Sequence, residues 1–245
     1  MKIAVIPDTQ VKPGQKFKFL FSVGLYIAKQ NPDVIVHLGD FADMSSLSSY
    51  DRGTKDFEGR RYLADISAAS NALNALEDGL DEGGLPSKTV KHMLLGNHED
   101  RITRAVQKQP ELDGLISLDD LPYTGYGWKV HDFLKVITVG GVAFSHYFVT
   151  GIAGRPASSP RAMLNKQHMS CVAGHQQGFQ VHTDYNARGD RVTAIIAGSC
   201  YKHSEKYLGP QGNKHWNGVL ILHEVKNGSF DLMPVSLNYI ERKYS

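Results

Sequence analysis

The sequence predicts an α/β protein with two stacked β-sheets and helices on the outside, and two observations carry that prediction. Over roughly the first 95 residues, apolar runs alternate with segments of helical periodicity, which is typical of βαβ units and a parallel sheet. After residue 128 the chain consists of short paired strands joined by turn sequences such as "ARGD" and "KNGS". Since no repeat or linker interrupts its 245 residues, we interpret residues 1–245 as one domain.

Four apolar runs each end in a polar cluster, as buried strands do where they reach the rim of a sheet. The runs lie in "KIAVIPDTQ", "DVIVHLGDFAD", "TVKHMLLGNHED" and "GGVAFSHY". Between the first two runs the spacing predicts a helix that ends before Pro32, and a second helix before the third run ends at Gly83. A further helix is predicted near "SPRAMLNKQ" in the second half.

Composition excludes several classes of protein. The two cysteines, Cys171 and Cys200, form no CxxC pair, so we expect reduced thiols and neither a zinc knuckle nor a disulfide framework. No signal-peptide pattern and no apolar stretch near 18 residues is present, which predicts a protein without a membrane span, in the cytoplasm of a bacterium or a phage-infected host. The net charge of +2 says little about partners.

The polar residues after the strands are chemically alike. Because the carboxyl ends of parallel strands meet in one crevice, we expect these side chains to converge. Carboxylates, amide oxygens and imidazoles together are the ligands of a divalent-metal site. The set comprises Asp8, Gln10, Asp40, Asn97 and His98 and, later in the chain, His146, His175 and Gln177.

The order of these fragments, D-x-[HNQ], GD, GNHE, H and GH, resembles the calcineurin-like metallophosphoesterases. The resemblance runs from Asp8 to about Gln177, and the "DTQ" and "GNHED" variants are similar to bacterial and phage-encoded members. It implies a four-layer α/β/β/α sandwich, two stacked mixed β-sheets flanked by helices, that holds two divalent metal ions above the sheet rims.

The resemblance also implies a role for each residue. Asp40 bridges both metals, Asp8 and Gln10 hold the first, and the second is held by Asn97, His146 and His175. Two cations ~3.5–4 Å apart share a hydroxide that attacks the phosphoryl group in line. His98 faces the substrate as a general acid, so His98 and Asp40 are the predicted catalytic residues. Glu99 either orients the loop or caps a helix.

The chain departs from the family where Gln10 and Gln177 replace histidines. Both changes fall on the first metal, and four oxygen donors favour Mn²⁺ or Mg²⁺ over Zn²⁺. We therefore expect an exchangeable first site, a firm second site, and Mn²⁺ as the metal, with Mg²⁺, Fe, Zn²⁺ or Ni²⁺ as alternatives. Gln176, His182 or no protein group at all are alternatives to Gln177.

Residues near the motifs can have a structural role in place of a functional one. Asp43 fits the family's GD-x-x-D pattern, but Met44 stands where an arginine often follows, so we assign Asp43 a structural hydrogen bond. Arg101, on the helix after "GNHED", is a predicted phosphate contact, and Arg104 on the same helix is a second candidate, although an exposed helix face explains both equally well.

Residues 200–218 offer the best clue to the substrate, because basic groups alternate with aromatic rings as on a surface for single-stranded nucleic acid. The predicted substrate contacts there are Tyr201, Lys202, His203 and Trp216. The alternative is a polar loop anchored by its aromatic residues.

Three functions follow from this reading. The first is a phosphodiesterase, in particular a nuclease acting on DNA or RNA. The second is a phosphomonoesterase, either a protein phosphatase or a nucleotidase, which Met44 makes less favourable. The third is a degenerate member of the fold that serves as an interaction module. The sequence does not indicate an oligomeric state.

Overall fold

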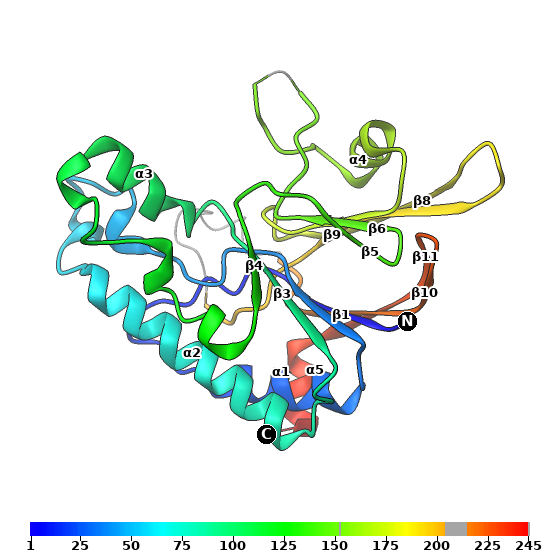
Figure 1. Cartoon of the computed structure of the whole chain (residues 1–245), viewed down its shortest axis with the longest axis horizontal. Helices are drawn as coiled ribbons and strands as arrows, with labels where there is room; N and C mark the ends of the chain where they lie inside the picture. The colour runs from blue at the N-terminus through cyan, green and yellow to red at the C-terminus, as the bar shows by residue number, and fades with distance from the viewer. Residues whose placement is uncertain (152, 204–214, 245) are drawn as a thin grey trace.

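The strands form two mixed sheets in the computed structural model, which describes residues 1–151, 153–203 and 215–244 (Figure 1). The first sheet has the order β11-β10-β1-β2-β3-β4. In it β1 to β4 run parallel, and β10 pairs antiparallel with both β1 and β11. Its strands are β1 (Ile3–Ile6), β2 (Val34–His37), β3 (Val90–Leu94), β4 (Lys129–His131), β10 (Gly218–Lys226) and β11 (Ser229–Ser236).

The second sheet has the order β5-β6-β7-β9-β8, with β6, β7 and β9 parallel at its centre and an antiparallel strand at each edge. Its strands are β5 (Ile137–Val139), β6 (Val142–Ser145), β7 (Cys171–Ala173), β8 (Phe179–Tyr185) and β9 (Arg191–Ala197). The predicted parallel first half and hairpin-rich second half are thus both present.

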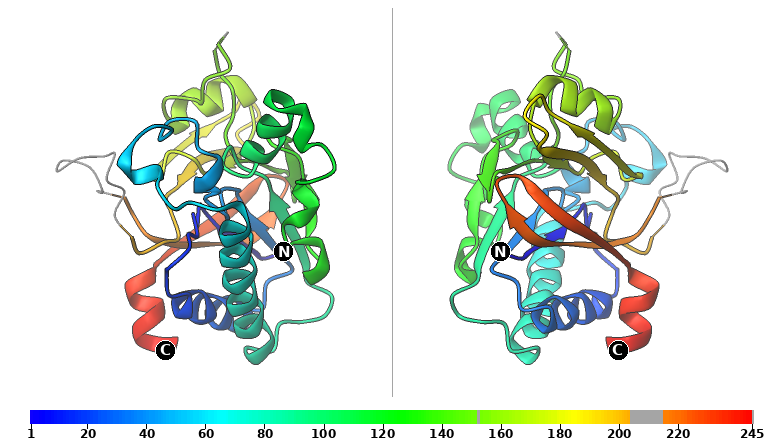
Figure 2. Two further views of the ribbon diagram at one scale, coloured as in Figure 1. Left: turned by 90° about the vertical axis from the view of Figure 1, so that its left-hand side faces the viewer. Right: turned by 90° about the vertical axis from the view of Figure 1, so that its right-hand side faces the viewer.

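Helices cover the outer faces of the stack, as the two side views in Figure 2 show. Against the first sheet pack α1 (Lys18–Lys29), α2 (Tyr62–Glu82) and α5 (Leu237–Tyr244), and against the second packs α4 (Pro160–Gln167). Alternate residues of β1 serve the two layers: Val5 faces the second sheet, whereas Ala4 packs with the helices. The predicted four-layer α/β/β/α sandwich is confirmed.

Two glycines let α1 and α2 cross closely beneath the first sheet. A Cβ atom on Gly24 would lie 2.2 Å from the carbonyl oxygen of Leu76, and one on Gly79 would lie 2.1 Å from that of Phe21. Because neither contact leaves room for a side chain, the backbones touch directly.

Five 3₁₀ helices and one further α-helix lie in the connections near the strand ends. They are η1 (Ser45–Leu47) and η2 (Lys55–Phe57) before α2, α3 (Asp100–Lys108) after β3, and η3 (Pro110–Leu112), η4 (Leu118–Asp120) and η5 (Thr124–Tyr126) before β4. The described part of the chain contains no helix with the length and apolar character that crossing a bilayer demands.

The two cysteines are buried free thiols, as expected. Burial raises the pKa of Cys171 to about 12, so its thiol is protonated and unreactive at neutral pH.

Candidate metal centre

The predicted ligands follow strands that end at a common rim. In the first sheet, Ile6 of β1 pairs with His37 of β2, which pairs with Met93 of β3, so the carboxyl ends of these parallel strands are level. The rim therefore receives Asp8, Asp40 and Asn97 from the first sheet, and His146 and His175 follow β6 and β7 of the second.

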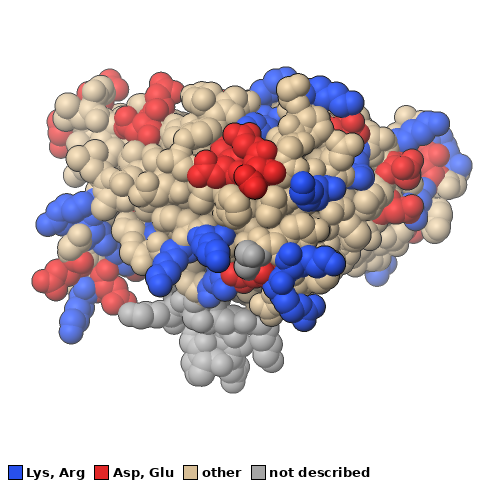
Figure 3. All heavy atoms as spheres, turned by 90° about the horizontal axis from the view of Figure 1, so that it is seen from below, with Lys and Arg blue, Asp and Glu red and all other residues tan. Residues whose placement is uncertain are grey.

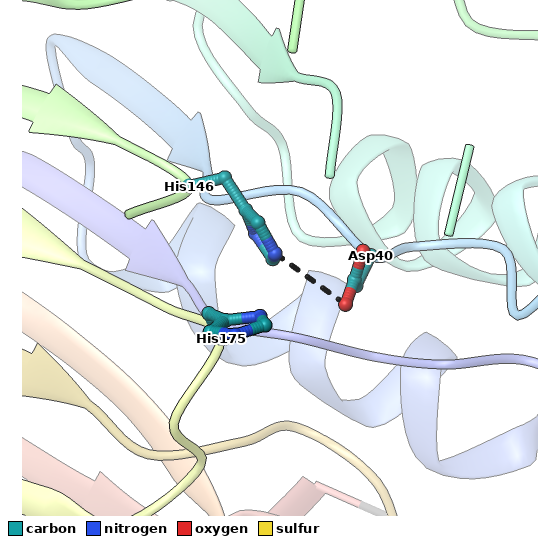
Figure 4. Close-up of side chains that lie close together, drawn as sticks. All are labelled: Asp40, His146 and His175. Atoms are coloured by element: carbon teal, nitrogen blue, oxygen red, sulfur yellow. Dashed lines mark ion pairs between the residues drawn. The ribbon is translucent and has the colours of Figure 1, made fainter. Parts of the chain in front are cut away.

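Three of these residues form a compact group (Figure 4). One ligand atom each from Asp40, His146 and His175 lies within 4.8 Å of the others, with Asp40 and His146 buried. The carboxylate oxygen Oδ2 of Asp40 lies 3.5 Å from Nε2 of His146. The amide oxygen of Asn97 lies 2.9 Å from the same nitrogen. Four of the predicted ligands are therefore in place to share one cation.

The hydrogen bonding of His146 tests whether a cation fits. Its Nδ1 lies 2.9 Å from the carbonyl oxygen of Leu38, and because a carbonyl only accepts, Nδ1 must carry the ring proton. In the neutral ring, Nε2 then directs a lone pair at the oxygens of Asn97 and Asp40. Three acceptors facing one another without a donor are satisfied by a divalent cation, and a hydrogen bond from the other ring nitrogen to a backbone carbonyl is typical for a metal-bound histidine.

Asp8 brings a second buried carboxylate to the rim. Both of its oxygens accept from the backbone N–H of His175, at 3.0 and 3.1 Å, and a Cβ on Gly174 would lie 2.3 Å from Oδ1. Burial raises the pKa of Asp8 to about 7, and the charge of Asp40 adds to that rise. Two carboxylates this poorly solvated need a cation to be charged together.

Gln10 lies in the same loop as Asp8, after β1, and is also buried. Its backbone N–H donates to the carbonyl oxygen of Asp40 at 2.8 Å, and its φ of 45° is in the left-handed region. The loop after β1 is therefore joined to the loop after β2 through the main chain.

Glu99 holds the rim loops in place. Its carboxylate is completely buried and accepts at 2.8–3.0 Å from the backbone N–H groups of Asp40, Ala42 and Gly96. The hydroxyl of Tyr123 donates to it at 3.1 Å. No side-chain hydrogen bond caps α3, so of the two roles left open by the sequence, Glu99 has the orienting one.

His98 lies beside the metal ligands and not among them. Its backbone N–H donates to Oδ1 of Asp40 at 2.9 Å, and its ring Nδ1 lies 2.6 Å from Oδ1 of Asp43. Its Nε2 lies 3.7 Å from Oδ2 of Asp40 and 3.2 Å from Nη2 of Arg101. Burial lowers the pKa of His98, but Asp40 and Asp43 outweigh that effect and the net shift is upward.

The sequence assigned Asp43 only a structural hydrogen bond, whereas the structure makes it the partner of His98. Arg101 donates to the backbone oxygen of Asp43 at 2.6 Å, and Lys12 lies 3.7 Å from its side chain. Burial works to raise the pKa of Asp43, but His98, Lys12 and Arg101 together lower it, so its carboxylate stays charged. The GD-x-x-D spacing was the signal.

A sequence model of the calcineurin-like phosphoesterases matches residues 1–198 of this chain, which include every rim residue described above. The chain belongs to the calcineurin-like phosphoesterase family. Members of this family are hydrolases of phosphate esters that typically bind two divalent metals, which fits the acceptor-lined rim.

Among curated proteins, this phosphoesterase is 27% identical over 194 residues to the Gene 54 protein of Mycobacterium phage L5, covering 74% of this chain and 72% of that protein. It is 26% identical over 190 residues to the Gene 54 protein of Mycobacterium phage D29, with the same coverage.

Two solved structures were also matched. A Vps29 double mutant from Entamoeba histolytica has a TM-score of 0.41 at 12% identity and covers 96% of this chain and 99% of its own. A predicted phosphoesterase from Streptococcus pneumoniae has a TM-score of 0.38 at 10% identity and covers 98% and 92%. The family assignment rests on the family sequence model alone.

Of the candidates for completing the first metal site in this phosphoesterase, Gln177 is the one at the rim. Its Oε1 accepts from the hydroxyl of Tyr201 at 2.8 Å, and the residue before Tyr201 donates its N–H to the carbonyl oxygen of Asp8. The amide of Gln176 turns away and donates to a backbone oxygen. His182 lies in β8 opposite Ala194 of β9, about 10 Å along the strand from Phe179 at its start.

The predicted substrate contacts of residues 200–203 and 216 mostly pack within the phosphoesterase. Tyr201 is 2% exposed and its ring stacks on His203, so it offers no face to a nucleic-acid base and supports Gln177 instead. Lys202 pairs with Glu241 at 2.8 Å, and the ring of Trp216 packs at a tilt against that of Phe179, with 4.8 Å between the centroids. The rest of the predicted loop, residues 204–214, lies outside the described residues.

A cavity of about 210 Å³ adjoins the metal centre on its α3 side. Two predicted ligands, Asn97 and His175, form its inner wall, and Arg101 and Arg104, the two arginines that the sequence offered as phosphate contacts, both line it. The other charged and aromatic side chains in its walls, which were not assigned to a site from the sequence, are Tyr50, Arg52, Lys108 and Tyr147.

Proposed function

We propose that this phosphoesterase is a metal-dependent phosphodiesterase that acts on nucleic acid. The observation that carries the proposal is the cavity that opens from the candidate metal centre past Asn97 and His175. A phosphodiester has an organic group on both sides of the phosphorus, whereas a monoester has one. Space beside the metal ligands is therefore required for a diester and unnecessary for a small monoester.

The proposed ligands divide into two sets that share Asp40. The first set is Asp8, Gln10, Asp40 and Gln177, and the second is Asp40, Asn97, His146 and His175. Bound cations would supply Lewis-acid neutralisation of the phosphoryl oxygens and an activated water. Since the first set offers only oxygen donors, we propose Mn²⁺ as the working metal, held more loosely in that site.

His98 is the proposed general acid. Its Nδ1–H is committed to Asp43, so Nε2 is the nitrogen available to the reacting phosphate beside Asp40. Nη2 of Arg101 donates to Nε2 at 3.2 Å, so we propose that Arg101 turns to the phosphate when Nε2 carries the proton. A proton on Nε2 would pass to the oxygen of the leaving group as the P–O bond breaks, which prevents an alkoxide from departing as an anion. Acid catalysis of this kind accelerates a reaction by about 10²–10⁴-fold.

The test compares bis-p-nitrophenyl phosphate with p-nitrophenyl phosphate as substrates of the Mn²⁺-loaded protein, with His98→Ala alongside. Faster turnover of the diester, lost in His98→Ala, would support the proposal. Faster turnover of the monoester would overturn it and favour a phosphomonoesterase. No turnover of either substrate by protein that titration calorimetry shows to bind Mn²⁺ would favour the interaction module.

A further inference from the structure

We propose that the cavity between α3 and residues 47–52 binds single-stranded nucleic acid on one side of the bond that is cleaved. This inference rests on the proposed function, because it assigns a path to the rest of a diester substrate whose phosphate is at the metal centre. It transfers substrate recognition from residues 200–218, which the sequence favoured, to the opposite side of the rim residues Asn97 and His175.

The first argument is charge. The cavity is lined by the cationic side chains of Arg52, Arg101, Arg104 and Lys108, and no carboxylate is among its lining residues. The whole chain has a net charge of only +2, and the face seen in Figure 3 carries separate small groups of basic and of acidic side chains. Asp100 and Asp43, behind the lining, pair with Arg104 and Arg101, but the cavity surface itself presents only cationic charge. Such a surface attracts a polyanion by direct attraction and by release of its counterions.

The second argument is the length of the charged stripe. Arg101, Arg104 and Lys108 are at positions i, i+3 and i+7 of α3, so they share one face of the helix. At 1.5 Å per residue, the seven steps from Arg101 to Lys108 span about 10 Å along the axis. That span exceeds one phosphate group, so the stripe suits consecutive phosphates of a strand.

The third argument is that the inner two cations are already held in position. Arg104 donates to the backbone oxygen of Asn97 at 2.6 Å and pairs with Asp100 at 3.0 Å. Arg101 donates to the backbone oxygen of Asp43 at 2.6 Å. Side chains fixed in this way lose less conformational entropy when a phosphate binds.

The fourth argument is the aromatic groups, which favour a nucleic-acid strand over another polyanion. Tyr50 is 88% exposed at the mouth of the cavity, an unusual environment for a ring of its size. Tyr147 lines the inner end, with its ring centroid 4.8 Å from that of His175. Rings beside a basic groove provide stacking surfaces for unpaired bases, and this combination is typical of proteins that bind single strands.

The test measures fluorescence anisotropy of a labelled oligothymidine, with the His98→Ala background used to prevent cleavage. The charge-reversed pair Arg52→Glu and Lys108→Glu lies away from the metal ligands and should weaken binding at least tenfold. It should also reduce the slope of log affinity against log salt by about 1.4, from two phosphate contacts at ~0.7 each. Tyr50→Ala should weaken binding about tenfold, and Tyr50→Phe should not.

The matched control reverses two exposed cations elsewhere, Lys88→Glu and Arg242→Glu, and should bind the oligonucleotide as the parent does. Mn²⁺ stoichiometry and melting temperature establish that each variant is folded. Equal loss in both charge-reversed pairs, or no loss in either, would overturn the cavity site. The cavity site would also be overturned if Arg52→Glu and Lys108→Glu weakened the binding of a phosphorylated acidic peptide and left the binding of the oligonucleotide unchanged. The binding measurement involves no turnover, so the two tests are independent. Faster turnover of the monoester would overturn the proposed function, and the anisotropy measurement would still show whether the cavity binds the oligonucleotide.

Discussion

The carboxylate of Asp43 lies 2.6 Å from Nδ1 of His98, and this contact determines how His98 can act. A carboxylate only accepts, so Nδ1 is the donor and Nε2 is left to face Asp40 and the substrate side. Met44, the residue after Asp43, has a φ of 49° in the left-handed region, where the chain turns to begin η1. The turn after β2 therefore delivers the partner of a residue that follows β3.

Replacing Asp43 by asparagine should slow catalysis more than it weakens substrate binding. An amide accepts a weaker hydrogen bond than a charged carboxylate and no longer favours the protonated ring, so we expect kcat to fall about 10–100-fold with KM nearly unchanged. The loss should grow as the leaving group becomes more basic. Stopped assays on aryl diesters of graded leaving-group pKa measure this, with surface Asp113→Asn as control. A uniform loss across leaving groups would show that Asp43 does not act through proton donation.

Gly96 is expected to tolerate no side chain. A Cβ there would lie 2.1 Å from Oδ1 and 2.3 Å from the backbone nitrogen of Asp40, both on a residue that the site needs in place. Gly96→Ala should therefore abolish tight Mn²⁺ binding and lower stability by about 1–3 kcal/mol. The matched control is Gly125→Ala, where nothing lies within 4 Å of the new methyl group. Titration calorimetry and urea denaturation measure the two effects, and a Gly96→Ala protein with normal Mn²⁺ affinity would contradict the prediction.

The carboxylate of Glu99 should stabilise the fold as well as the site. Glu99→Gln replaces one of the two carboxylate oxygens by an amide N–H₂. That group would face either the backbone N–H groups of Asp40 and Gly96 or the N–H of Ala42 and the hydroxyl of Tyr123, so we expect the free energy of unfolding to fall by about 1–3 kcal/mol. Tyr123→Phe removes one donor to the same carboxylate and should cost about 1 kcal/mol. Urea denaturation of both variants, at fixed Mn²⁺, provides the comparison. A larger loss in Tyr123→Phe than in Glu99→Gln would locate the stabilising role in the hydroxyl of Tyr123 and not in the carboxylate.

The strand ends were predictable because two local signals coincide there. Short runs of β-branched residues with both faces covered mark the parallel strands, and the acids, amides and histidines that follow them mark the rim. The same reasoning did not predict α5, whose sequence "LNYIERKY" is short and mostly polar. Its burial depends on Leu237 and Ile240, which pack into the core between the first sheet and its helices, and that is a tertiary contact.

The contacts that complete the site were beyond local patterns. Glu99 binds backbone groups of two loops, and a backbone partner leaves no mark in the sequence. Tyr201 was predicted to contact substrate because basic groups alternate with aromatic rings around it, yet it is buried against Gln177. The cavity joins residues 47–52 to α3, about 50 residues later, and only the fold brings those segments together.

In the metal-free protein, the charged carboxylate of Asp8 should lower the stability of the fold. Its pKa rises from 3.8 to about 7, chiefly through burial, so the folded, metal-free protein retains a proton that the unfolded chain releases. Metal-free protein should therefore lose stability as pH rises from about 4 through about 7. Asp8→Asn removes this charge and should raise the melting temperature of chelator-treated protein at pH 8 by at least ~2–4 °C.

The same Asp8→Asn protein should gain little melting temperature from Mn²⁺, whereas the parent should gain more as pH rises, because the cation replaces the missing proton as the partner of the carboxylate. Calorimetric scans between pH 5 and pH 8, with and without Mn²⁺, measure both trends. Asp113→Asn, at an exposed position, should follow the parent at every pH. A chelator-treated Asp8→Asn protein that melts below the parent at pH 8 would contradict the argument, since it would mean that the charged carboxylate is stabilised by the protein alone.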